Sequence, residues 1–404
     1  MTSKLSTVQR ILAGSPLRHQ TGGCLFVLVL VPLLGVAMLG HLTLWITSLD
    51  ALGIAFVAAT LGLVATLPAI ALLWYLDRRE RETIWMVISA LLYGAVVSTG
   101  VSALLNGIGF GFISVGLDIV AGVDAQSLAE LLAAALIAPP VEEAAKGLAL
   151  IGLFWLLRAE FDNVRDGIVY GGLIGLGFNI AEYALYVMQG YLISGTAPFA
   201  EQLATRFVFL GINGHTLWTA IFGASLGYAR QATSRIGRVL GPSAGYVVAV
   251  GSHALNNSVG IFLLALILTL AGFDFAQETV IIPPLALWLA AAIMNGLVQF
   301  FAYVMLAIAL IHSARWERSI IRAQLANEVG GAVTPEEYAL LRSDTLFSSH
   351  RLQRITDRRA AAIVNAQNEL AFRKWHVARD GGQIETDVLV HAWRTDIKRL
   401  RTSV

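Results

Sequence analysis

Long apolar runs separated by short polar linkers fill the chain between residues 25 and 312. The runs lie at about residues 25–47, 51–76, 84–105, 127–157, 167–190, 204–229, 239–271 and 281–312. Each is long enough for the roughly 20 residues that a helix needs to cross a bilayer. The pattern therefore predicts an all-α fold, a polytopic membrane helix bundle of about eight transmembrane helices.

Two of these runs, 127–157 and 239–271, are too long for one straight span, so each is expected to be tilted or broken. Pro139-Pro140 lies inside the first of them. Proline is tolerated in the first turn of a helix, where its missing N–H would be unpaired in any case. The pair is therefore predicted to open a new helix, with Glu142 and Glu143 in its first turns.

The distribution of arginine between the runs predicts the topology. Arginines follow the second, fourth and sixth runs: Arg78, Arg79, Arg81, Arg158, Arg165, Arg230, Arg235 and Arg238. The linkers near 48–50, 106–126, 191–203 and 272–280 contain no lysine or arginine, and Arg206 is the one basic residue near that side. Because cytoplasmic linkers carry the excess of positive charge, the pattern predicts both termini in the cytoplasm.

The two ends of the chain are polar. Residues 1–24 are predicted to be a cytoplasmic N-terminal segment, and residues 313–404 a cytoplasmic C-terminal helical tail. Apolar spacing at 336–342 and 351–379, with many arginines in the second, indicates amphipathic helices. Such a tail could lie on anionic lipid or bind a partner helix, or it could be a solvated tail that docks loosely.

Composition agrees with a multi-span membrane protein, since 56% of the residues are hydrophobic, 14% are charged and the mean hydropathy is +0.69. The formal charge of +1 argues against a strongly polyanionic main partner, and we expect no nucleic acid as a partner. The single cysteine, Cys24, rules out an internal disulfide. We expect no cleavable signal peptide, because the first apolar run is long and lacks a small-residue cleavage site.

Three ionisable residues interrupt the otherwise apolar stretch from Leu131 to Leu157 in the fourth run. Glu142 and Glu143 are adjacent, and Lys146 follows them by four and three residues, so it shares a helix face with both. Ionisable groups at membrane depth are expensive, and they usually mark a functional site. The alternative is a structural ion pair between helices.

Three later runs also carry polar residues that a purely structural helix would avoid. The fifth contains Asn179 and Glu182, the sixth His215, and the seventh His253 and Asn257. At ~1.5 Å per residue, all of them fall at a depth compatible with that of the glutamate pair, in the middle-to-outer membrane. We therefore expect these side chains to meet in one cavity.

This set of residues provides bases and polarising donors without a convincing nucleophile. A carboxylate in a poorly solvated pocket suits a general base acting on water, although Lys146 would favour its ionised form. His253 and Asn257 lie four residues apart on one helix face and could donate to a developing oxyanion. These features favour hydrolysis by an activated water.

Other intramembrane chemistries fit the sequence less well. No H-E-x-x-H occurs, and Asp118, Asp124 and Asp274 fall in outer linkers. Residues 223–227 match G-x-S-x-G but lack the strand–turn–helix context of a hydrolase. Ser225 also lies near the cytoplasmic end of its run, so we assign this motif to close helix packing.

The four polar segments resemble motifs of the PrsW family of bacterial intramembrane proteases, within the wider group of CAAX-processing glutamic proteases. Residues 142–146 are similar to its E-E-x-x-K motif and residues 178–182 to its F-x-x-x-E motif. His215 with Trp218-Thr219 is similar to the third motif, and residues 253–257 to H-x-x-x-N. The resemblance covers roughly residues 80–312. CAAX-type enzymes typically carry histidine where this chain has Glu182.

The resemblance implies a transmembrane protease-like domain at 25–312, in a bacterial cytoplasmic membrane. It implies that the substrate is a single-span membrane protein of the anti-sigma-factor type, cut near the outer face. By this resemblance Glu142 activates water, supported by Glu143 and Lys146. Glu182 and His215 position the water or the proton, and His253 and Asn257 polarise the scissile carbonyl.

No cofactor is expected in this glutamic mechanism. A close variant places zinc among residues that are legitimate zinc ligands: Glu142, Glu182, His215 and His253. Two functions of other classes stay open from the sequence. One is a transporter that uses the carboxylates as a proton or cation relay, and the other is a non-catalytic membrane scaffold.

Overall fold

The computed structural model describes residue 12 and residues 15–46, 48–79, 82–121, 126–276, 280–346, 348–354 and 357–402, and every regular element within them is a helix. The predicted N-terminal segment 1–24 lies mostly outside the described residues, as do Arg81 and Asp124. The all-α fold class is confirmed.

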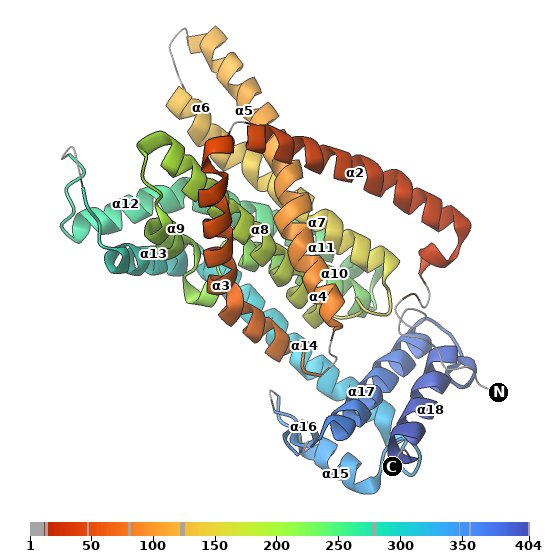
Figure 1. The fold of residues 1–404 in the computed structure, drawn as a ribbon. Coiled ribbons are helices and arrows are strands. Elements are labelled where there is room, and N and C mark those ends of the chain that lie inside the picture. The colour runs from red at the N-terminus through yellow and green to blue at the C-terminus, as the bar shows by residue number, and fades with distance from the viewer. Residues whose placement is uncertain are drawn as a thin grey trace.

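The predicted runs correspond to helices or to chains of helices (Figure 1). In order these are α2 (Gln20–Ile46), α3 (Leu52–Leu76), α4 (Ile84–Leu92), α5 (Thr99–Ala121), α6 (Gln126–Leu132), α7 (Ala138–Leu156), α8 (Val164–Ser194), α9 (Phe199–Arg206), α10 (His215–Gln231), α11 (Arg235–Leu255), α12 (Ile261–Leu270), α13 (Pro284–Val298) and α14 (Phe300–Ala326). Segments η3 (Tyr93–Ser98), η4 (Ala133–Ile137) and η6 (Asn256–Gly260) are π-helical turns that join α4 to α5, α6 to α7 and α11 to α12.

Within the described residues, five helical stretches are long and apolar enough to cross a membrane, and α13 with α14, bent by 69°, makes a sixth if the pair is one span. The chain is therefore a multi-pass membrane protein. The number eight stays a prediction, because two of the predicted spans are less regular than the others. The stretch 126–156 contains four charged residues, and α10 has only 17 residues.

The predicted sixth span, 204–229, is not one helix. α9 ends at Arg206 and α10 begins at His215. Between them Gly211 and Gly214 have φ values of 83° and 54°, which favour glycine and interrupt a right-handed helix. The break makes His215 the first residue of α10.

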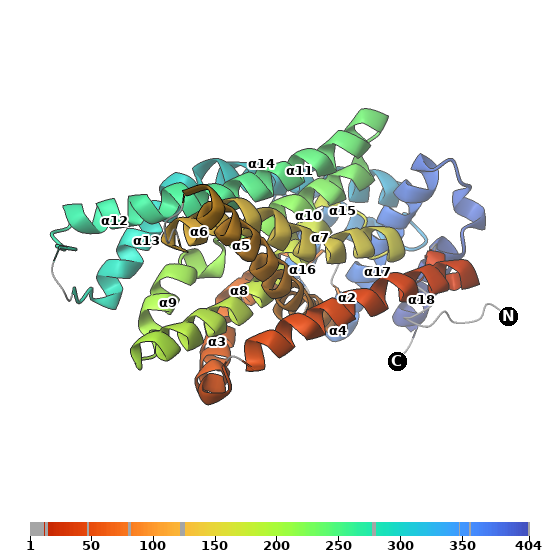
Figure 2. The same ribbon diagram turned by 90° about the horizontal axis from the view of Figure 1, so that it is seen from above.

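Helix α8 is the centre of the bundle, and most of its length is buried. Figure 2 shows α2 and α11 on opposite sides of the bundle. Gly167, Gly171 and Gly175 recur every four residues on α8, where an added Cβ would collide with the backbone of α10. Gly223 of α10 is equally restricted by α8, which supports the packing role predicted for residues 223–227. This close approach fixes His215 relative to Glu182.

The C-terminal tail has a hydrophobic core of its own. Its further helices are α15 (Pro335–Ser343), α16 (His350–Gln353), α17 (Arg358–Arg379) and α18 (Val388–Thr402). Buried apolar residues of α14, α15, α17 and α18 form the core, including Leu325, Leu370 and Val390. Residue 312, the predicted boundary, lies inside α14, which runs from the membrane helices into this core (Figure 1).

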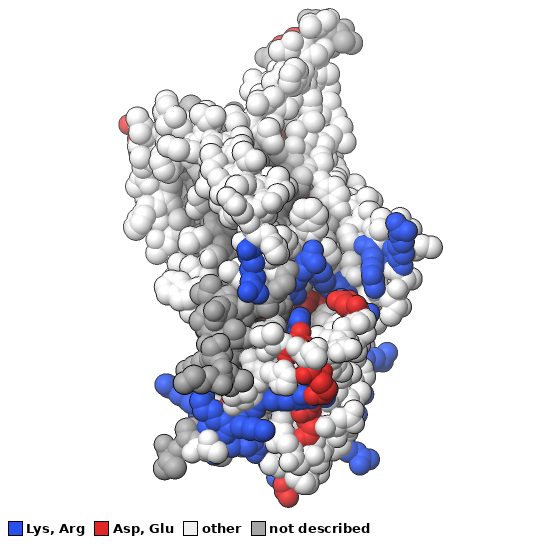
Figure 3. Space-filling view, turned by 90° about the vertical axis from the view of Figure 1, so that its right-hand side faces the viewer, with Lys and Arg blue, Asp and Glu red and all other residues white. Residues whose placement is uncertain are grey.

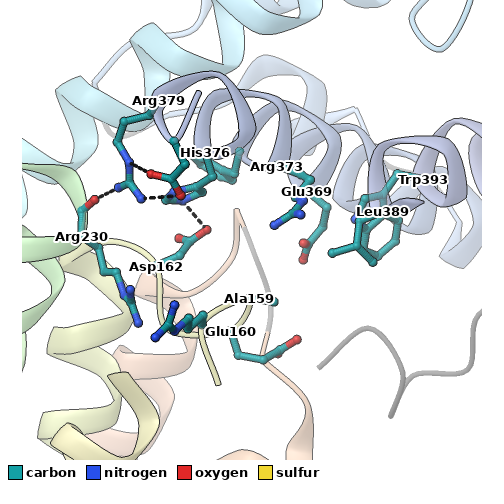
Figure 4. Close-up of a pocket in the computed structure, with 13 residues that line it drawn as sticks. Ala159, Glu160, Asp162, Arg230, Glu369, Arg373, His376, Arg379, Leu389 and Trp393 are labelled. Carbon is teal, nitrogen blue, oxygen red and sulfur yellow. Dashed lines mark hydrogen bonds and ion pairs between the residues drawn. The ribbon is translucent and has the colours of Figure 1, made fainter. Parts of the chain in front are cut away.

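Buried polar contacts join the tail to linkers of the membrane helices. Asn368 donates to the backbone oxygen of Arg79 at 2.6 Å, and Glu317 of α14 pairs with Arg165 at 2.7 Å. His376 lies 2.7 Å from Asp162 beside a cavity of about 210 Å³ (Figure 4). In Figure 3, lysine and arginine gather over the tail side of the molecule, while the opposite side is largely uncharged. The tail thus packs firmly against the arginine-bearing linkers.

Candidate active site

Four helices bring six of the seven predicted site residues together. Glu142, Glu143 and Lys146 come from α7, Glu182 from α8, His215 from α10 and His253 from α11. All are buried or nearly so, and Lys146 is 0% exposed. The glycine-lined contact between α8 and α10 and the start of α10 at His215 place Glu182 and His215 side by side.

Lys146 pairs with Glu143 and not with Glu142. Its Nζ donates to Glu143 Oε1 at 2.6 Å and lies 2.8 Å from His215 Nδ1. An ammonium group has no acceptor, so Nδ1 of His215 must accept this hydrogen bond. The ring proton is then on Nε2, which donates to Glu182 Oε2 at 2.6 Å.

Glu143 is the acceptor at the centre of this network. Besides Lys146, its carboxylate accepts from His253 Nδ1 at 3.1 Å and from Thr219 Oγ1 at 3.2 Å. The contact with His253 leaves Nε2 of that ring as the nitrogen that faces Glu142. Glu143 therefore sets the direction of His253 in the way that Glu182 sets that of His215.

Glu142 has different surroundings. Its Oε1 accepts from Asn106 Nδ2 at 3.0 Å, whereas Oε2 is buried and has no hydrogen-bond partner in the described structure. Oε2 lies 3.8 Å from His215 Nδ1 and 3.9 Å from His253 Nε2. Two ring nitrogens and one carboxylate oxygen therefore face a common point.

Aromatic rings hold both histidines. Trp218 stacks on His253 with centroids 4.1 Å apart and planes 15° apart, and Phe178 lies 4.7 Å from the His215 ring. Lys146 Nζ is 4.5 Å from the centre of the Phe178 ring, a cation–π contact. The apolar walls fix the ring orientations and limit access of bulk water.

The structure does not join Asn257 to this cluster. Its Nδ2 donates to the backbone oxygen of Ala134 in η4 at 3.0 Å, and within the described residues no hydrogen bond links it to either glutamate. Asn257 lies in the π-helical turn η6. Its predicted role stays a prediction.

Sequence reasoning missed three polar residues of the site. Asn106 was expected in an outer linker, but it lies within α5 and reaches Glu142. Arg206 donates to Glu182 at 2.6 Å. Gln299, between α13 and α14, accepts from Trp218 Nε1 at 2.9 Å. Each is a single polar residue within or beside an apolar run, which was the available signal.

The residues around Glu142 fit a metal ion by type and spacing. One ligand atom each from Glu142, His215 and His253 lie within 4.8 Å of one another. The other ring nitrogen of each histidine contacts a carboxylate, as is usual for metal-bound histidine. The one contact that an ion would replace is that of Lys146 with His215. Glu182, also predicted as a ligand, instead contacts the outer side of His215.

Comparison with known proteins identifies the family. Residues 82–289, about half of the chain, match the sequence model of the PrsW family, described as intramembrane metalloproteases. The chain belongs to the PrsW family. It is also 28% identical over 169 residues to the protease PrsW of Oceanobacillus iheyensis, an alignment that covers 41% of this chain and 68% of the relative. No solved structure matches the chain.

PrsW membership confirms the resemblance inferred from the four motifs and identifies the protein as an intramembrane protease. All seven predicted site residues lie within the matched region, as do Asn106 and Arg206. Gln299, the whole of α14 and the rest of the tail lie beyond it.

Proposed function

We propose that this protein is an endopeptidase of the bacterial cytoplasmic membrane that cleaves a single-span, membrane-anchored protein with water activated by Glu142. The observation that carries the proposal is the buried, unpartnered Oε2 of Glu142, which faces His215 and His253 at 3.8 and 3.9 Å. One water between these atoms would donate a hydrogen bond to Oε2 of Glu142 and contact Nε2 of His253, while Nδ1 of His215 accepts from Lys146. The anti-sigma-factor class of substrate and the cytoplasmic position of both termini are part of the proposal.

The charges around the site suit Glu142 as the proton acceptor. Lys146 pairs with Glu143, and Arg206 pairs with Glu182. Among the described residues, neither a lysine nor an arginine lies within ion-pair distance of Glu142. Glu142 forms no ion pair with either cation and keeps an oxygen without a hydrogen-bond partner, so it is the member of the cluster suited to general-base catalysis.

In the proposed reaction, Oε2 of Glu142 takes a proton from water as the water oxygen attacks the scissile carbonyl carbon. The same proton then passes to the amide nitrogen as the C–N bond breaks, which yields a carboxyl group and an amine. Donation from His253 Nε2 to the developing oxyanion requires the imidazolium form. Glu143, 3.1 Å from Nδ1, would stabilise that form.

A metal-dependent variant is favoured by the carboxylate contacts on both histidines. Glu142, His215 and His253 would hold the ion, and a zinc ion bound there would polarise water or the carbonyl as a Lewis acid. If this variant operates, we predict that a chelator abolishes cleavage by the purified protein and that added zinc restores it. Chelator-insensitive cleavage by protein free of bound metal would exclude it.

Co-expression with tagged single-span candidate proteins tests the proposed function. We expect wild type to release a shortened fragment of one candidate, and Glu142→Gln to leave that candidate intact at the same membrane level. Ser225→Ala is the matched control, because Ser225 donates to the backbone of its own helix and lies outside the cluster. A fragment of equal intensity from wild type and Glu142→Gln would contradict the proposal.

A further inference from the structure

Arg206, the last residue of α9, shares an acceptor with the catalytic cluster. Its NH1 donates to Glu182 Oε2 at 2.6 Å, and the same oxygen accepts from His215 Nε2 at 2.6 Å. A single carboxylate oxygen therefore receives both donors. We propose that Arg206 is a positioning residue that orients His215 through Glu182, an inference that rests on the proposed function.

The guanidinium of Arg206 is itself held in place. Its Nε donates to Gln202 Oε1 at 3.0 Å, and its central carbon lies 4.2 Å from the centre of the Tyr186 ring. Its backbone oxygen accepts from Asn179 of α8 at 3.2 Å. Because a planar guanidinium bound at several points loses little further freedom, Arg206 presents NH1 to Glu182 in one fixed direction.

The position of Arg206 is unusual for a basic residue of this chain. The linkers on its side of the membrane otherwise contain no lysine or arginine, whereas those on the tail side are rich in arginine. Its side chain is only 19% exposed. Removing a charged group from water is costly unless it is paired. Glu182 pairs with this charge, and the same carboxylate oxygen lies 2.6 Å from Nε2 of His215. A residue that only set the topology would not need this contact with the site.

The contact has a direct consequence for His215. With Glu182 held by Arg206, Nε2–H of His215 points to Glu182, and Nδ1 points to Lys146 and the side of Glu142. Without Arg206, Glu182 would keep only one of these two donors and could leave the histidine. The ring would then lose its fixed direction. Arg206 thus acts on the reaction without touching the reacting atoms.

The test compares Arg206→Gln, Arg206→Lys, Glu182→Gln and the double variant Arg206→Gln with Glu182→Gln, all in the full chain. The assay uses a membrane-anchored reporter that wild type cleaves and Glu142→Gln does not. The matched control is Arg373→Gln, which breaks an arginine–carboxylate pair of equal length, 2.6 Å to Asp387, in the distant tail. For each variant kcat, KM and the unfolding temperature Tm are measured.

We expect Arg206→Gln to lower kcat by about 10–100-fold, the usual cost of removing a partner that orients a catalytic histidine. KM should change little, and Arg206→Lys should recover part of kcat because it keeps a cationic donor. The double variant should be no slower than Glu182→Gln alone. The Arg373→Gln control should leave kcat unchanged.

Three results would overturn the proposal. The first is a kcat for Arg206→Gln equal to that of the control, and the second is a lower kcat at unchanged Tm that Arg206→Lys does not recover. The third is a double variant whose loss of kcat equals the product of the two single losses. If Arg206→Gln lowers Tm, Gln202→Ala is measured in its place. This substitution removes the acceptor of Arg206 Nε but keeps the charge of Arg206. An unchanged kcat in Gln202→Ala would then overturn the proposal. Failure of wild type to cleave any reporter would instead contradict the proposed function.

Discussion

At the scale of single residues, Glu142 and Glu143 are neighbours in the sequence with opposite surroundings. Glu143 accepts from Lys146, His253 and a threonine, so both of its oxygens are hydrogen-bonded. Glu142 keeps one buried oxygen without a hydrogen-bond partner, directed at two imidazoles. Glu143 is therefore suited to holding the site together, and Glu142 to reacting.

This contrast predicts that the two glutamates fail differently when changed to glutamine. Glu143→Gln removes the charge that pairs with Lys146, which is 0% exposed. Breaking a buried ion pair costs about 3–5 kcal/mol, so we expect a lower Tm and less protein in the membrane. Glu142→Gln should keep a Tm close to that of wild type. Equal Tm values for the two variants in thermal unfolding would contradict the assignment.

Most of the site residues could be predicted because charged residues are conspicuous in apolar runs. Glu142, Lys146 and His215 stood out in this way, and the structure brings them together. Asn106 could not be assigned, because one amide in an apolar stretch does not indicate a partner 36 residues away. Arg206 was visible as the one basic residue on its side, but its pairing with Glu182 depends on the break before α10.

At the scale of elements, irregular segments place the site. The π-helical turn η4 leads into α7, η6 follows His253, and a loop precedes His215. Pro139-Pro140 correctly indicated the start of α7. The loop at 207–214 was not predicted, because glycine also occurs throughout the regular helix α8, so its presence alone does not indicate a break.

The bend between α13 and α14 makes a further element that supports the site. Gln299 at the bend is fully buried, and its Oε1 accepts from Trp218, whose ring stacks on His253. Its Nε2 donates to the backbone oxygen of Ser252 at 3.3 Å. The bend therefore ties α14 to the orientation of His253.

Gln299→Leu should reduce catalysis without abolishing it. The substitution leaves the indole N–H of Trp218 without its acceptor and removes the link to α11. A misplacement of about 1 Å can cost about 100-fold in rate, so we expect a loss between tenfold and 100-fold in kcat. Reporter cleavage and Tm would be measured beside Ser225→Ala. A wild-type rate in a folded Gln299→Leu protein would contradict this role for the bend.

At the scale of the whole molecule, the arginine-bearing linkers and the C-terminal tail lie on the same side of the helix bundle. The arginine-bearing linkers lie next to the tail, which contacts them through Asn368 and His376. The composition of the tail was also compatible with loose docking. It could not predict the packed interface between the tail and the linkers, because the contacts there connect residues up to 289 positions apart.

This arrangement predicts which positions can be labelled from outside the cell. In a variant without the exposed native Cys24, single cysteines at Asp50, Ser194 and Asp274 should react with a membrane-impermeant thiol reagent. A cysteine at Arg235 should react only after the membrane is opened. Labelling at position 235 in intact cells would contradict the predicted topology.

The most direct test of the central claim is the rate at which purified Glu142→Gln cleaves a reporter that wild type cuts. Glutamine keeps the size of the side chain and the acceptor for Asn106 but cannot take a proton from water. We predict a rate about 10²–10⁴-fold below wild type, with an unchanged Tm. A folded Glu142→Gln protein that cleaves at the wild-type rate would contradict the account.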